Sequence, residues 1–189
     1  MTVDPVSDAF AAAPRVWFLP PNARHRASYD GPIAIGHGQT NSQPRTVENM
    51  LRLLAVRPGD RVLDVGSGSG WTTGLLAHLT GPAGEVLGLE LEPELVELGR
   101  GNLARGDWPW ARIEQAAPGP YGDPERAPYD RILVSAEADE LPASLVDQLG
   151  PTGRMVVPVG GQLVVVAKDQ GGGQPRVSRH GHYRFVPLR

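Results

Sequence analysis

Three glycines at alternate positions, Gly66, Gly68 and Gly70, are the strongest sign of a binding site in this 189-residue sequence. A short apolar run precedes them and a helical stretch follows, an order that lets a ligand lie against bare backbone at the positive end of a helix. The G-x-G-x-G spacing differs from the G-x-G-x-x-G of dinucleotide sites, and no Gly-Lys-Ser/Thr follows as in a P-loop. The pattern indicates a nucleoside-type ligand, with a tight strand-to-helix turn as the alternative.

Two acidic residues accompany this glycine loop. Asp64 comes just before it, and Glu90 ends the next predicted strand. Glu90 lies roughly 20 residues past the loop, where an acidic side chain can accept hydrogen bonds from ribose hydroxyls. Pro93 then starts a helix, with Glu92 and Glu94 at its positive end. The alternative for Glu90 is a solvated strand end that binds nothing.

Strands and helices must alternate to position these residues, and the apolar periodicity predicts that they do. Such alternation implies right-handed crossovers and a parallel sheet with helices on both faces. Helices are predicted near residues 44–55, 71–80, 93–105 and 142–149, and strands near residues 61–65, 85–90, 111–115, 130–135 and 154–159.

The two ends of the chain differ from this core. A short helix is predicted around residues 8–13, within an otherwise irregular segment. Apolar strands at 162–168 and 182–186 are separated by a glycine run, which predicts a C-terminal β-hairpin. We interpret the chain, residues 1–189, as one domain. Its parts are an irregular N-terminal segment, a ligand-binding α/β core and the hairpin, at residues 1–43, 44–160 and 161–189.

Composition excludes several classes of function. The net charge is only -3 and no basic run occurs, so nucleic acid is not an expected partner. The absence of cysteine excludes disulfides, thiolate metal sites and cysteine nucleophiles. His180 and His182 have no third ligand nearby, so no metal site is expected. No signal peptide or membrane-spanning run is evident, and we expect a cytoplasmic monomer with no membrane partner.

Five segments resemble the protein-L-isoaspartate O-methyltransferase family, in the same order and spacing. The most specific is residues 36–44, GHGQTNSQP, which is similar to the family's G-x-G-Q-T-I-S-Q-P segment. The resemblance covers nearly the whole chain. The other segments are residues 13–20 (APRVWFLP), 127–132 (APYDRI), 149–160 (LGPTGRMVVPVG) and 183–188 (YRFVPL).

This resemblance implies a class I S-adenosylmethionine-dependent methyltransferase fold, which is a doubly wound, Rossmann-like α/β domain. Its seven-stranded sheet is mostly parallel, with an antiparallel C-terminal strand. The implied activity is methylation of the free α-carboxylate of isoaspartyl residues in proteins or peptides, with S-adenosylhomocysteine as product. Ser42 matches the family's active-site serine. The residues implied in cofactor binding are Gln39, Thr40, Asp64, Gly66, Gly68, Ser69, Glu90 and Gly119.

The residue types suit this chemistry. A solvated carboxyl has a pKa near 4, so the acceptor is already a nucleophile at neutral pH. The site need only orient and desolvate it, and no strong general base is required. A neutral hydroxyl such as that of Ser42 fits a step in which opposite charges are annihilated. Because Pro44 follows, Ser42 could alternatively be a helix N-cap, and the two roles can coexist.

Three departures from the family pattern bear on function. Residues 8–10 fall near the start of the sequence, so we expect a shortened first helix and a more open substrate cleft. Asn41 stands where the family has an apolar Ile or Val. Pro118 replaces the aspartate of a G-D-G segment that would accept the adenine amino group, and we expect Gln115, a backbone carbonyl or solvent to accept instead.

Two rival functions remain compatible with the sequence. One is a carboxyl methyltransferase with the same fold that acts on an aspartate of a biosynthetic peptide. The other is a non-catalytic binding protein that has lost adenine recognition. Ser42 and the intact glycine loop favour an enzyme.

Overall fold

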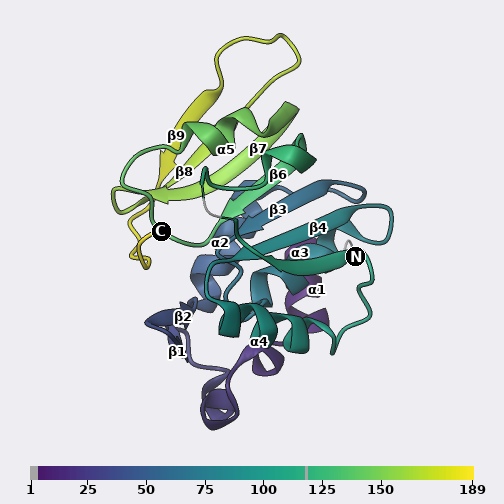
Figure 1. The fold of residues 1–189 in the computed structure, drawn as a ribbon, viewed down its shortest axis with the longest axis vertical. Coiled ribbons are helices and arrows are strands. Elements are labelled where there is room, and N and C mark those ends of the chain that lie inside the picture. Colours follow the sequence, from purple (N-terminus) through teal and green to yellow (C-terminus); the bar gives the residue numbers. More distant parts are fainter. Residues whose placement is uncertain (1–3, 118) are drawn as a thin grey trace.

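A computed structural model describes residues 4–117 and 119–189, and a seven-stranded sheet forms its centre (Figure 1). The strands are β3 (Arg61–Val65), β4 (Glu85–Glu90), β5 (Ala111–Gln115), β6 (Tyr129–Val134), β7 (Leu149–Val159), β8 (Gln162–Ala167) and β9 (Arg176–His180). Their order is β5-β4-β3-β6-β7-β8-β9. Strands β3 to β7 are parallel, and β8 is antiparallel to both of its neighbours. The predicted α/β fold with a mostly parallel sheet is confirmed.

Helices cover both faces of the sheet, but unequally. The α1–α3 face carries the larger helical layer, and α5 packs on the opposite face with a second apolar cluster. No helix among the described residues is long and apolar enough to span a membrane. The α-helices are α1 (Pro5–Ala12), α2 (Pro44–Leu54), α3 (Trp71–Thr80), α4 (Pro93–Leu103) and α5 (Ala143–Asp147), and the 3-10 helices are η1 (Arg15–Phe18), η2 (Pro21–Arg26) and η3 (Pro124–Arg126).

Side-chain periodicity explains how these layers form. Along β3, Val62 packs into the cluster on the α1–α3 face, and the next residue, Leu63, packs into the cluster on the α5 face. In α2, Val47, Met50 and Leu54 recur on one helix face and are buried against the sheet. Because strands β3 to β7 run parallel, their carboxyl ends meet at one edge of the sheet, where the connecting loops gather.

The C-terminal hairpin forms, but its second strand is not the predicted one. The second strand is β9, which is mostly exposed. Residues 182–186, where a strand was predicted, lie outside the sheet. Tyr183 and Phe185 pack instead against the core cluster on the α1–α3 face. The prediction of a strand at 182–186 is wrong because these apolar side chains serve tertiary packing, while β9 is held by backbone pairing with β8.

The N-terminal segment is more regular than predicted. Residues 1–43 were expected to be irregular apart from one helix, which the structure confirms as α1. They also contain an antiparallel pair of strands, β1 (Ile33–Gly36) and β2 (Gln39–Asn41). The turn between them has positive φ at Gly36, His37 and Gly38, with values of 103°, 53° and 72°. Two glycines in such a turn were a hairpin signal that the sequence contained.

Candidate functional site

A cavity of about 310 Å³ lies at the carboxyl ends of β3 and β4. Ligands of open α/β sheets bind at this edge, where the strand order reverses direction. The volume is within the usual range of small-molecule sites, roughly 300–1,000 Å³. The cavity brings together segments that are far apart in the sequence. Its lining comes from residues 39–42, 47, 65–69, 71–72, 89–91, 116–117, 119–122, 135–136 and 186–189.

The glycine loop, residues 66–70, borders this cavity through residues 66–69. The amides of Gly66 and Ser67 donate to Leu89 O at 2.9 and 3.0 Å, which ties the loop to β4. Gly70 has a φ of 87°, and a Cβ there would lie 3.0 Å from Gly99 O of α4. Glycine is therefore required at this position both by the backbone conformation and by the close approach of α4.

Glu90 is buried at the end of β4 and organises the neighbouring turn. Its Oε2 accepts from the Gly68 amide at 2.8 Å. Its Oε1 accepts from the amides of Leu91 and Glu92 at 2.8 and 3.0 Å. The side chain is only 7% exposed, so it is not a solvated strand end. A carboxylate offers about four acceptor sites, which leaves capacity for a ligand hydroxyl.

Asp64 lies outside the cavity lining, behind the glycine loop. Its Oδ2 accepts from the hydroxyls of Thr72 and Thr73 at 2.7 Å each, while Oδ1 is buried without a partner. Burial raises the pKa of Asp64 to about 6; the two threonine hydroxyls lower it, and the nearby Glu90 raises it further. Asp64 thus links β3 to the first turn of α3, and a direct cofactor contact for it stays a prediction.

Replacing Asp64 with Asn is expected to change how stability depends on pH. The pKa of the folded carboxyl, about 6, exceeds the unfolded value of about 3.9, so the folded state binds more protons between these values. This group's contribution to the free energy of unfolding therefore falls by about 2 kcal/mol as the pH rises from 4 to 7. In Asp64→Asn this decrease in the free energy of unfolding is absent. Denaturant unfolding of both proteins at several pH values between 4 and 7 measures the difference. Exposed Asp139→Asn is the control, and a pH-independent difference between Asp64→Asn and the original chain would contradict the expectation.

Residues 39–42 form the opposite wall, and all of them line the cavity. Ser42 does not cap α2, because Gln43 occupies the N-cap position and makes no side-chain cap bond. The N-cap alternative for Ser42 is therefore wrong. Its partly buried side chain borders the cavity, which leaves the hydroxyl available to a ligand.

Arg15 holds this wall in place from behind. Its Nη1 donates to Tyr29 O at 2.7 Å, and its Nη2 donates to Gly31 O at 2.8 Å and to Ser42 O at 2.9 Å. The guanidinium also lies 5.3 Å from the centre of the Trp71 ring. Burial lowers the pKa of Arg15 to about 10, so it stays charged at neutral pH. The motif at residues 13–20 contains Arg15, but the sequence alone indicates no role for this residue.

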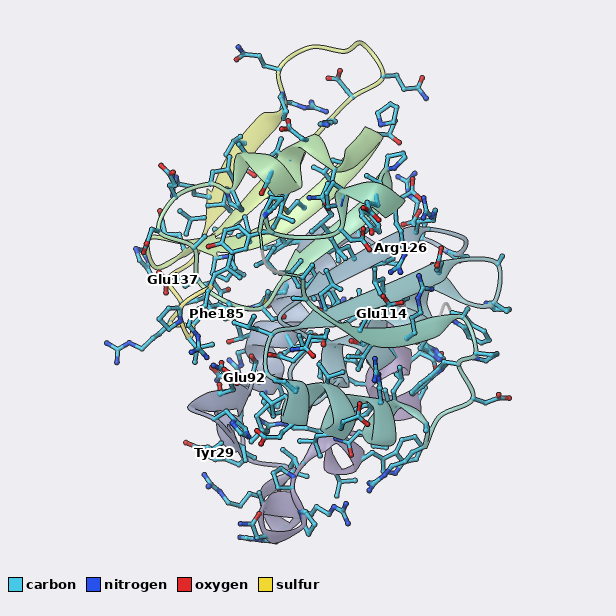
Figure 2. The ribbon with its side chains drawn as sticks, viewed as in Figure 1. Tyr29, Glu92, Glu114, Arg126, Glu137 and Phe185 are labelled. Carbon is cyan, nitrogen blue, oxygen red and sulfur yellow. The ribbon has the colours of Figure 1, made fainter. Side chains whose placement is uncertain are left out.

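The C-terminal tail is a part of the site that sequence reasoning missed. Residues 186–189 line the cavity, on the side of the molecule where Glu92, Glu137 and Phe185 are labelled in Figure 2. The amide of Glu137 donates to Val186 O, and the Leu188 amide donates to Glu137 O, both at 2.7 Å. These long-range bonds fix the tail beside the loop after β6, and no local sequence signal predicts them.

The residues that follow β5 form the predicted adenine side of the site. Gly119, a predicted cofactor-binding residue, lines the cavity with a φ of 128°. Pro118, on which the absence of an adenine acceptor was argued, lies outside the described residues. Gln115 is not part of the cavity lining, and its Nε2 donates to Leu91 O at 3.2 Å. A role for Gln115 as adenine acceptor therefore remains a prediction.

Comparison with known proteins decides the family. The model of the family protein-L-isoaspartate(D-aspartate) O-methyltransferase matches residues 1–189. The chain belongs to this family. It is 44% identical over 186 residues to the protein-L-isoaspartate O-methyltransferase of Aeropyrum pernix, with 97% of this chain and 72% of that protein covered. The protein-L-isoaspartate O-methyltransferase of Methanopyrus kandleri is 43% identical over 187 residues, with 97% of this chain and 82% of that protein covered.

A solved structure of the same family supports the fold and the cofactor. It is that of a putative protein-L-isoaspartate O-methyltransferase from Plasmodium falciparum in complex with S-adenosyl-L-homocysteine. The TM-score is 0.83 at 27% identity, and the match covers 100% of this chain and 92% of the other. The resemblance seen in the sequence motifs is confirmed, and S-adenosylmethionine is the cofactor of this methyltransferase family.

The residues of this chain fit such a cofactor. The glycine loop offers backbone without side chains, and Glu90 offers carboxylate acceptor sites beside it. Ser67 Oγ and Ser135 Oγ are buried without a hydrogen-bond partner, and both residues line the cavity. Buried polar atoms are normally paired, so two orphaned hydroxyls in one cavity indicate a polar ligand.

Proposed function

We propose that this chain transfers a methyl group to the free α-carboxylate of an isoaspartyl residue in a protein or peptide. One observation carries the proposal above the others: the wall containing Ser42 and the glycine loop face the same cavity. A methyl donor held at the glycine loop would then lie opposite an acceptor held at Ser42. Gln39 and Thr40 line the same wall and would border the methyl end.

The residues need only place and desolvate the acceptor. S-adenosylmethionine supplies an electrophilic methyl group, and a carboxylate with a pKa near 4 is already ionised at neutral pH. Ser42 would donate a hydrogen bond to one carboxylate oxygen and leave the other free to react. The following backbone amide nitrogen would then attack the ester carbonyl and expel methanol to form a succinimide, which water reopens partly to normal aspartate.

The position of Arg15 is consistent with this proposal. Its guanidinium is not part of the cavity lining and is bonded to backbone and amide oxygens behind the wall. A cation in direct contact with the acceptor would stabilise the ground state, because negative charge disappears in the transition state. Placed behind Ser42, the charge of Arg15 favours an anionic acceptor without forming a direct ion pair with it.

Replacing Ser42 with Ala is expected to lower kcat at least about tenfold, equivalent to about 1.4 kcal/mol. The hydroxyl that orients the carboxylate is lost, while the cofactor side of the cavity is unchanged. Methyl transfer to an isoaspartyl peptide measures the rate, and calorimetry with S-adenosylhomocysteine measures cofactor affinity, which should change less. Ser178→Ala on the exposed strand β9 is the control. Equal activity of Ser42→Ala and Ser178→Ala would contradict the role of Ser42.

We further propose that the chain acts as a cytoplasmic monomer without a metal ion. The described residues hold no group of three or more His, Cys, Asp or Glu side chains placed to bind a metal. The proposed chemistry also needs no Lewis acid, because the nucleophile is already ionised.

A further inference from the structure

Asn41 is a buried residue of the cavity wall formed by residues 39–42. It is 4% exposed and directly precedes Ser42. It is also the polar residue that stands where the family motif has Ile or Val. A buried amide costs free energy unless its donor and its acceptor are both satisfied, so its partners indicate why it is tolerated here.

Both ends of the Asn41 amide are bonded, and to different parts of the molecule. Its Oδ1 accepts from Arg15 Nε at 2.7 Å, and its Nδ2 donates to Ser69 Oγ at 3.2 Å. Ser69 belongs to the glycine loop and is itself 2% exposed. The chain of bonds from Arg15 through Asn41 to Ser69 therefore joins the Ser42 wall directly to the glycine loop.

Each end of this link is anchored. Arg15 Nη2 donates to the carbonyls of Asn41 and Ser42, at 3.1 and 2.9 Å, so the guanidinium fixes the backbone around Ser42. On the other side, Ser69 O accepts from Asn102 Nδ2 of α4 at 3.1 Å. An Ile side chain at position 41 could occupy the space but could bond neither anchor.

We propose that Asn41 is a positioning residue for methyl transfer, because its amide holds the Ser42 wall at a fixed distance from the glycine loop. The inference rests on the proposed function and adds to it the residue that sets the separation between acceptor and donor. In-line displacement is sensitive to this separation, and a misplacement of about 1 Å can cost about a hundredfold in rate.

Two substitutions separate positioning from mere packing. Asn41→Ile removes both bonds, and kcat is expected to fall about tenfold or more while the affinity for S-adenosylhomocysteine changes less than about threefold. Asn41→Asp keeps an acceptor for Arg15 and a second acceptor that the Ser69 hydroxyl can reach. It should therefore keep kcat within about threefold of the original chain and raise KM, since it adds negative charge near an anionic acceptor.

A double-mutant cycle tests the link itself. Ser69→Ala removes the far anchor of the bond, so its effect on kcat should be smaller in the Asn41→Ile background than in the original chain. Additive effects of the two substitutions would overturn the proposal. So would an Asn41→Ile variant with unchanged kcat, or an Asn41→Asp variant as slow as Asn41→Ile.

Amide hydrogen exchange gives a readout that needs no peptide acceptor. With S-adenosylhomocysteine bound, peptides covering residues 36–44 should exchange about tenfold faster in Asn41→Ile than in the original chain, because local opening becomes easier. Unchanged exchange would overturn the positioning role whether or not the isoaspartyl assay succeeds. Faster exchange together with no methylation by the original chain would instead leave the link intact and reject the proposed function.

Discussion

Replacing Glu90 with Gln is expected to weaken binding of S-adenosylhomocysteine about a hundredfold or more, equivalent to about 3 kcal/mol. Two effects add. The charge-assisted hydrogen bonds to ribose hydroxyls are lost, and the new NH₂ group must face a backbone donor. Glu90 accepts from three amides, those of Gly68, Leu91 and Glu92, with its two oxygens. An amide side chain has one oxygen and cannot satisfy both sets.

Calorimetric titration with S-adenosylhomocysteine checks this expectation. The matched control is Glu94→Gln, a nearby change of the same type at a side chain that is 74% exposed and does not line the cavity. Glu94→Gln should bind S-adenosylhomocysteine as the original chain does. If the two variants bound it equally well, Glu90 would not be part of the cofactor site.

Replacing Arg15 with Met is expected to lower the free energy of unfolding by about 3–5 kcal/mol. The substitution keeps an apolar stem, but it removes the donors for carbonyls of Tyr29, Gly31 and Ser42 and for the Asn41 amide. These oxygens lie in a largely buried site, where the guanidinium itself is part of a residue only 6% exposed. Acceptors left without a donor there lose their bonds without regaining water.

Denaturant unfolding measures this loss, with Arg45→Met as the control. Arg45 pairs with Asp30 at 3.5 Å, but its side chain is 77% exposed. Exposed ion pairs contribute little, so the control should change stability by less than about 0.5 kcal/mol. Similar losses for the two variants would show that Arg15 does not anchor the wall that contains Ser42.

The parts of the site that depend on local sequence were predictable. The glycine loop and Glu90 belong to one strand-turn-helix unit and the strand beside it, so short-range patterns place them together. Their positions on one cavity agree with that reasoning. Asp64 shows the limit of short-range patterns: the residue type was recognised, but only the structure reveals that its carboxylate accepts hydrogen bonds from Thr72 and Thr73.

The parts that depend on long-range contacts were not predictable from periodicity. Residues 186–189 reach the cavity because backbone bonds join them to Glu137, some 50 positions earlier. Strand β9 was not predicted because its residues are mostly polar and exposed. The alternating apolar residues Tyr183 and Phe185 have the pattern of a strand, but they pack against the core outside the sheet. Burial in the tertiary structure overrides the local pattern at both places.

The most direct test of the proposed function is methyl transfer from labelled S-adenosylmethionine to matched peptides. One peptide carries an isoaspartyl residue, and the other has normal aspartate at the same position. We expect base-labile methyl ester on the isoaspartyl peptide, with kcat/KM at least about a hundredfold higher than for the aspartyl peptide, a discrimination of about 2.7 kcal/mol. Methylation of the aspartyl peptide at an equal or greater rate, or of neither peptide although S-adenosylhomocysteine binds, would contradict the account.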